Sequence, residues 1–199
     1  MKKSVSLLVL LFLLMDSVLA QNNNADFFKE TYRKGFVTNL GDTSKYQKIF
    51  FDAFPSNFKD LKKLYGWNEQ TNTGRPLTNI PATYFSRFFE IKSVSHKALT
   101  KKIIDVSVNA KWYADAIARF QLDAFKYAIT YNKEFIGQLQ ARSKADIISV
   151  WTFYFDYVNP IYRKNAYDKI VKATAPNSKK MVSLITAGYK NAAAKWRTH

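Results

Sequence analysis

The sequence predicts an all-α protein, a single-domain bundle of about seven to nine helices around an aromatic-rich core. Apolar residues recur at three- and four-residue intervals along most of the chain, the period of a helix with one buried face. Aromatic residues make up 16% of the chain, enough to fill a core with large rings. The segment Trp151–Tyr157 has five aromatic residues in seven, so it presents rings on nearly every side and belongs inside the protein.

The first 20 residues have the pattern of a secretory signal peptide. Lys2 and Lys3 precede an apolar run, Leu7–Met15, and Val18–Ala20 supplies the small residues that signal peptidase requires. The run is too short to span a bilayer, so we expect export, with the mature chain starting at Gln21. The alternative to a signal peptide is that this apolar run is a buried helix of the mature domain. No later stretch is long and apolar enough to span a membrane, which predicts a periplasmic or extracellular protein.

Residues 21–199 are expected to form the helical domain. Cleavage of the signal peptide removes two lysines and one aspartate, which lowers the formal net charge from +16 to +15. The chain has no cysteine, so neither disulfides nor zinc–thiolate sites can hold it together. We therefore expect packing alone to stabilise the fold.

Capping and turn residues divide the N-terminal part of the chain into short elements. We expect three helices there, at 25–34, 44–53 and 58–65. Asn24 suits the cap of the first helix, and Gly35 is expected to end it. Glycine, asparagine, threonine and proline are concentrated between Gly66 and Ile80, which predicts one long loop.

The rest of the chain is predicted to be almost entirely helical. The expected helices begin at Pro81, at about Ser95, at about Asn109, after Ser143, at Pro160 and at Asn177 or Ser178. The helix from Asn109 is the longest and continues to about Ala141. Apolar and polar residues alternate between Ile103 and Val108, so a short strand is the alternative to a helix there.

Basic residues are concentrated in the C-terminal fifth of the chain. Nine basic residues and one acid, Asp168, lie between Pro160 and His199, and such a field attracts anionic partners. The candidate contact residues in this region are Lys179, Lys180, Lys190, Lys195 and Arg197. An acidic protein, an anionic lipid or an anionic wall polymer fits this charge, and a merely solvating surface is the alternative. Nucleic acid is not expected, because the chain is exported and lacks a nucleic-acid-binding motif.

The sequence has no catalytic or cofactor-binding signature. It has one internal histidine, His96, and neither a glycine-rich phosphate loop nor a nucleophile elbow. We therefore expect no enzyme activity, no cofactor and no metal site. A peptidoglycan hydrolase that uses carboxylates is the catalytic alternative. Its candidate residues are Glu69, Glu90 and Glu134.

Two features are predicted to matter in the folded protein. The loop Gly66–Ile80 is a candidate contact element, because Trp67, Asn72 and Arg75 are residue types that anchor interfaces. A packed connector is the alternative reading of that loop. Asp156 interrupts the aromatic segment and needs a partner if it is buried, so we predict an ion pair with Arg163.

Three stretches carry a resemblance to known proteins: FPSNFKDLKKLYGWNE (Phe54–Glu69), KWYADAIARFQ (Lys111–Gln121) and SVWTFYFDYVNP (Ser149–Pro160). Together they resemble small exported helical proteins of Gram-negative bacteria, some of which are encoded beside toxin genes and suspected of being immunity proteins. The resemblance implies a periplasmic binder that neutralises an incoming toxin, and it carries over no functional residues. The leading hypothesis is therefore an exported, non-catalytic protein that binds an acidic protein partner.

Overall fold

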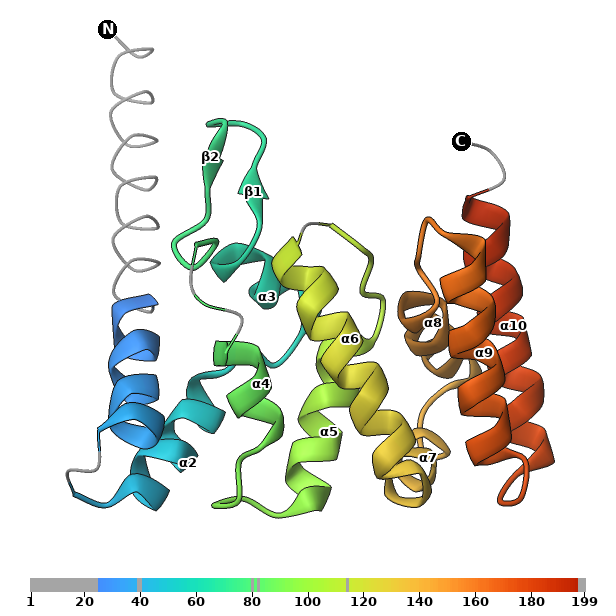
Figure 1. The fold of residues 1–199 in the computed structure, drawn as a ribbon, viewed down its shortest axis with the longest axis horizontal. Helices are drawn as coiled ribbons and strands as arrows, with labels where there is room; N and C mark the ends of the chain where they lie inside the picture. The colour runs from blue at the N-terminus through green and yellow to red at the C-terminus, as the bar shows by residue number, and fades with distance from the viewer. Residues whose placement is uncertain (1–24, 39–40, 80, 82, 114, 197–199) are drawn as a thin grey trace, which may run out of the picture.

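Helices dominate the fold, as Figure 1 shows. The structure is a computed structural model that describes residues 25–196 apart from 39–40, 80, 82 and 114, with the backbone alone at Asp115 and Ala116. The all-α prediction is confirmed for these residues, with one short hairpin as the exception. The predicted signal peptide, Asn24 and Arg197 lie outside the described residues.

The N-terminal half consists of short helices and the hairpin. A helix at 25–32 continues as the π-helix η1 (Arg33–Val37), followed by α2 (Thr43–Ala53), α3 (Phe58–Leu64), β1 (Trp67–Asn68), β2 (Thr73–Gly74), α4 (Thr83–Phe89) and α5 (His96–Ser107). The two strands pair antiparallel, with Trp67 opposite Gly74. The predicted loop therefore contains a hairpin, and the first helix does not end at Gly35.

The C-terminal half consists of five helices. These are α6 (Asp115–Thr130), α7 (Asn132–Leu139), α8 (Lys144–Tyr154), α9 (Pro160–Thr174) and α10 (Lys179–Lys195). Figure 1 shows α9 and α10 side by side, and α10 also packs against α8. Among the described residues, no helix combines the length and the apolar content that crossing a bilayer requires.

Side-chain caps explain where most of the helices begin. Each of these residues accepts a hydrogen bond from a backbone N–H in the first turn: Asp42, Asn57, Ser95, Ser143, Asn159 and Ser178. The predicted cap Ser143 is confirmed, and so is Pro160 in the first turn of α9; of the two predicted starts of the last helix, Ser178 is the cap. The segment that could have been a strand is the helix α5.

The predicted long helix from Asn109 to Ala141 is wrong, because α6 begins only at Asp115 and ends at Thr130. Asn109 has a φ of 55°, and tertiary hydrogen bonds hold Trp112 and Tyr113 outside any helix. Further along, the side-chain amide of Asn132 donates to the carbonyl of Ala128, which competes with continuous helical bonding. This division gives ten helical segments in the described part of the chain, one more than predicted.

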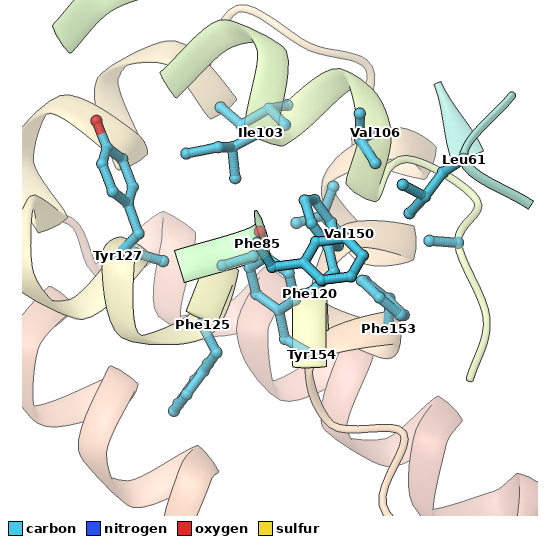
Figure 2. Close-up of a cluster of buried hydrophobic side chains, with 14 of the residues drawn as sticks. Leu61, Phe85, Ile103, Val106, Phe120, Phe125, Tyr127, Val150, Phe153 and Tyr154 are labelled. Atoms are coloured by element: carbon cyan, nitrogen blue, oxygen red, sulfur yellow. The ribbon is translucent and has the colours of Figure 1, made fainter. Parts of the chain in front are cut away.

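The core is rich in aromatic rings, and Figure 2 shows one cluster in which they pack with aliphatic side chains. Phe120 lies within 6.2 Å of the ring centres of Phe54 and Phe85, and within 6.5 Å of that of Phe153. The aromatic segment predicted from the sequence is confirmed as a core element: Trp151, Phe153, Tyr154 and Phe155 are fully buried. The helix α8 itself ends at Tyr154, so the chain leaves the helix within that segment.

Candidate binding groove

An open groove of about 740 Å³ lies between α3, the β1–β2 hairpin and the connection from α5 to α6. Figure 1 shows these three segments close together on the upper side of the molecule, between the N-terminal helices and α9. The charged and aromatic residues that line the groove include Phe58, Lys59, Lys62, Lys63, Trp67, Glu69, Arg75, Lys111 and Tyr113. Five of these side chains are cationic and one is a carboxylate, so the groove suits an anionic ligand.

The hairpin is attached to α3 by backbone hydrogen bonds. Gly66, which follows α3, has a φ of 101°, a conformation that favours glycine, and its carbonyl accepts from the Arg75 N–H at 2.9 Å. The Thr78 hydroxyl also donates to that carbonyl, and the Leu77 N–H donates to the carbonyl of Leu64 at 2.8 Å. These bonds fix Arg75 opposite the end of α3.

Trp67 presents a large exposed ring in the groove, held in one orientation. Its relative exposure is 45%, and its indole Nε1 donates to Asn72 Oδ1 at 3.3 Å. Asn72 has a φ of 50°, a left-handed conformation that asparagine tolerates in turns. Tyr113 donates its hydroxyl to the carbonyl of Trp67 at 2.7 Å, which joins the hairpin to the α5–α6 connection.

The positive charge of the groove is only partly compensated. Lys63 pairs with Asp60 at 2.7 Å, and this bond lowers the pKa of the Asp60 carboxyl below its ordinary value. In the described part of the chain, no carboxylate pairs with Lys59, Lys62, Arg75 or Lys111. Lys62 instead lies 3.9 Å from the centre of the Tyr113 ring.

Arg75 contributes a guanidinium to the groove lining and has one buried donor that is unpaired in the described part of the chain. Its Nε is buried and has no hydrogen-bond partner among the described residues. A buried donor without a partner destabilises a protein by about 1–3 kcal/mol, so such groups call for an explanation. Because Nε has almost no accessible surface, a carboxylate or phosphate in the groove would bind at the terminal nitrogens of the guanidinium instead.

The structure unites part of the predicted contact element and adds residues that the sequence did not indicate. Trp67 and Arg75 both line the groove, and Asn72 orients Trp67 without lining it. Lysines of α3 and of the α5–α6 connection were not predicted, because only the tertiary fold places 108–113 against α3. The clustering of Lys59, Lys62 and Lys63 just before Trp67 was the one available signal.

The predicted C-terminal cations lie elsewhere. Lys179, Lys180 and Lys190 are exposed on α10, and Lys180 lines a separate cavity of about 510 Å³ together with Arg142 and Lys144. Lys195 is bound to the carboxylate of Asp156 at 2.7 Å. The structure therefore does not bring these lysines into the groove.

The predicted Asp156–Arg163 ion pair is wrong. Asp156 is 3% exposed, and its carboxylate accepts from Lys195 Nζ, from Trp196 Nε1 at 2.8 Å and from the Trp112 N–H at 3.1 Å. Arg163 is also buried, but its guanidinium donates to the backbone carbonyls of Tyr157 and Val158. The end of α10 lies against Asp156. Lys195 is 39 residues from Asp156 in the sequence, so local spacing could not predict this contact.

The candidate catalytic carboxylates are at separate places. Glu69 lines the groove, where the Tyr113 hydroxyl lies 3.5 Å from it. Glu90 pairs with Arg87 at 2.9 Å, and Glu134 accepts from Gln138 in α7. Among the described residues, no three histidine or acidic side chains form a group that could hold a metal ion.

Comparisons of the chain with protein-family models, with curated proteins and with solved structures found no match.

Proposed function

We propose that this protein is an exported, non-enzymatic binding protein that captures an acidic protein partner in the groove. The observation that carries the proposal is the exposed Trp67, hydrogen-bonded to Asn72, in a groove where four of the five cationic side chains have no carboxylate partner among the described residues. Tryptophan, tyrosine and arginine are the residues that most often dominate the energy of protein interfaces. An immunity-type role, in which the bound protein is a toxin whose active site becomes covered, is the form of this function that we favour.

The shape of the groove supports a macromolecular ligand. It is open to solvent along α3 and the hairpin, and Trp67 and Lys111 remain exposed at its edge. A pocket for a small molecule would enclose most of its ligand. An acidic loop or helix of a partner can instead lie along the groove, with a carboxylate on Arg75 and apolar contact with Trp67.

Charge supports the choice of an acidic partner. The whole chain carries +16, and most of its carboxylates are already used in ion pairs within the chain. Complementary charge speeds association and gives specificity, whereas buried aromatic anchors determine how long a complex lasts. We therefore expect the lysines of the groove to control the association rate and Trp67 the dissociation rate.

Affinity capture tests this function. The immobilised protein is exposed to envelope extract at moderate salt, the retained protein is identified and purified, and its binding kinetics are measured. Trp67→Ala should raise the dissociation constant by about 30-fold, chiefly through faster dissociation. Lys59→Glu with Lys111→Glu should lower the association rate by about tenfold at low salt.

The matched control has the same net charge as the groove double variant. Lys180→Glu with Lys190→Glu makes an equal charge change on α10, outside the groove, and should alter the association rate much less. Equal effects of the two double variants would show that only the overall charge matters, and would remove the groove from the proposal. Clearing of peptidoglycan in zymograms that is lost in Glu69→Gln would replace it with the hydrolase alternative.

A further inference from the structure

Three strongly exposed apolar side chains of the described residues lie together at the start of α9. Val158, Ile161 and Tyr162 have relative exposures of 62%, 66% and 64% and lie within five residues of one another. We call these three residues the apolar tip. Single exposed apolar residues are ordinary, but a contiguous group marks a surface that contacts something. None of the three lines the groove or the cavity beside α10.

The fold holds the apolar tip rigidly in this exposed position. The Asn159 side chain accepts from the N–H groups of Ile161 and Tyr162 and so caps α9, and Pro160 begins the helix. The buried Arg163 donates to the carbonyls of Tyr157 and Val158. The exposure of the apolar tip is thus maintained by hydrogen bonds to the backbone on both sides of it.

The surface behind the apolar tip is cationic. Lys169 and Lys172 are exposed, and at 100° per residue they fall in the same arc of about 100° as Ile161 and Tyr162. On α10, Lys179, Lys180 and Lys190 are also exposed. The one acid of the two helices, Asp168, is neutralised by Lys164 at 2.6 Å. The outer side of α9 therefore combines projecting apolar groups with uncompensated lysines.

We propose that this side of α9 docks on an anionic lipid bilayer, with the apolar tip inserted below the headgroups. Aliphatic and tyrosine side chains next to lysines are the composition that binds at a lipid interface. Each lysine near an anionic bilayer adds to the binding, and its long side chain reaches the headgroups. A bilayer can also deform around a projecting group, whereas a protein partner would need a matching pocket. The inference is independent of the groove, which lies on other elements.

Co-sedimentation of the full mature chain with vesicles tests the inference. The chain should sediment with phosphatidylcholine vesicles that contain phosphatidylglycerol, and should remain in solution with phosphatidylcholine alone. Ile161→Ser with Tyr162→Ser should reduce partitioning by about tenfold or more, because the inserted apolar area is lost. Lys169→Gln with Lys172→Gln should reduce it by about fivefold at low salt and weaken its salt dependence.

Two control variants separate insertion from other causes. Val37→Ser removes an equally exposed apolar side chain from η1, at 62% exposure, and should leave partitioning unchanged. Lys59→Gln with Lys111→Gln removes two groove charges and should also leave it largely unchanged. Thermal unfolding of each variant confirms that it is folded.

Three outcomes would overturn the inference. One is no sedimentation with phosphatidylglycerol vesicles at low salt, and another is sedimentation that the serine variant leaves unchanged. The third is a serine variant that loses the captured protein partner but binds vesicles normally, which would assign the apolar tip to a protein interface. The first two results leave Trp67 and the groove untouched, so the two proposals can fail separately, whereas the third would also move the partner's contact surface from the groove to the apolar tip.

Discussion

At the scale of single residues, the carboxylate of Asp156 joins its own segment to two distant parts of the chain. It accepts hydrogen bonds from the backbone of Trp112, from Lys195 and from the indole of Trp196. Trp112 precedes Tyr113, whose ring and hydroxyl form one wall of the groove. The end of α10 is therefore connected through Asp156 to the candidate binding site.

Replacing Asp156 with asparagine should lower the free energy of unfolding by about 2 kcal/mol, because the buried carboxylate accepts bonds at both oxygens and an amide would set its NH2 group against one of those donors. Chemical denaturation measures the change. The control is Asp168→Asn, which breaks an exposed pair with Lys164 and should cost less than about 0.5 kcal/mol. A similar decrease in the free energy of unfolding in the two variants would contradict a larger stabilising role for the buried carboxylate.

Two buried tyrosines make a second comparison, because only one of their hydroxyls is hydrogen-bonded. Tyr154 lies 3.0 Å from the Ser107 hydroxyl, whereas the Tyr65 hydroxyl has no partner among the described residues. Tyr65→Phe should therefore raise the free energy of unfolding by about 1 kcal/mol, and Tyr154→Phe should lower it by about 1 kcal/mol. Denaturant titration of both variants tests the opposite signs, and a loss in both would be evidence against an unpaired Tyr65.

The residues of the candidate site were partly predictable. Trp67 and Arg75 were identified because their types are common in interfaces and the loop around them is rich in turn formers. Lys111 and Tyr113 were not identified, because the sequence places them in a predicted helix. Two long-range hydrogen bonds hold this segment at the groove, one from the Tyr113 hydroxyl to the carbonyl of Trp67 and one from the Trp112 N–H to Asp156. The partner of Asp156 was missed for the same reason: Lys195 is distant in sequence.

At the scale of elements, the contact between α8 and α10 depends on one glycine. A Cβ added at Gly188 would lie 2.5 Å from the Cβ of Trp151 and 2.9 Å from the backbone N of Thr152. Gly188→Ala should thus push the helices apart and lower the free energy of unfolding by about 2 kcal/mol. Thermal and chemical unfolding measure the effect.

Gly137 provides the control, since it lies within α7 and a Cβ there would meet nothing within 4 Å. Gly137→Ala should raise the free energy of unfolding by about 0.8 kcal/mol through helix propensity. A Gly188→Ala variant as stable as the parent would mean that α8 and α10 are less closely packed than the structure indicates.

Most helices could be placed from the sequence because their signals are local. Ser143, Ser178 and Pro160 mark helix starts through their own chemistry, and the aromatic segment marks burial. The breaks that were missed have tertiary causes. The amide of Asn132 competes for a helical carbonyl while it also bonds to Thr174, and no local pattern predicts that pairing.

At the scale of the whole molecule, the core is a connected set of rings in a chain without cysteine. Burial raises the pKa of the tyrosine hydroxyls of Tyr65, Tyr84, Tyr127, Tyr154 and Tyr157. In the unfolded chain these groups titrate at about pH 10. Below that pH both states hold the protons, and above it the unfolded state releases them first.

The free energy of unfolding should therefore fall as pH rises above about 10.5, as far as about pH 12. Lys102 has the opposite effect at lower pH, because burial lowers its pKa to about 8. Above that pH the folded state loses the Lys102 proton while the unfolded state keeps it, so this group makes the free energy of unfolding rise with pH until the unfolded lysine also titrates. Denaturation at a series of pH values measures the slope, and Tyr65→Phe should reduce it. Phenolate absorbance of all the tyrosines appearing while the protein is still folded would contradict this.

The positions of the four tryptophans make the molecule its own optical probe. Trp151 is fully buried in the core, Trp67 stands in the groove, and Trp112 and Trp196 flank Asp156. A buried indole emits fluorescence at shorter wavelength than a hydrated one. The emission of variants that keep a single tryptophan would therefore report separately on the core, on the groove and on the contact between the end of α10 and Asp156, without any attached dye.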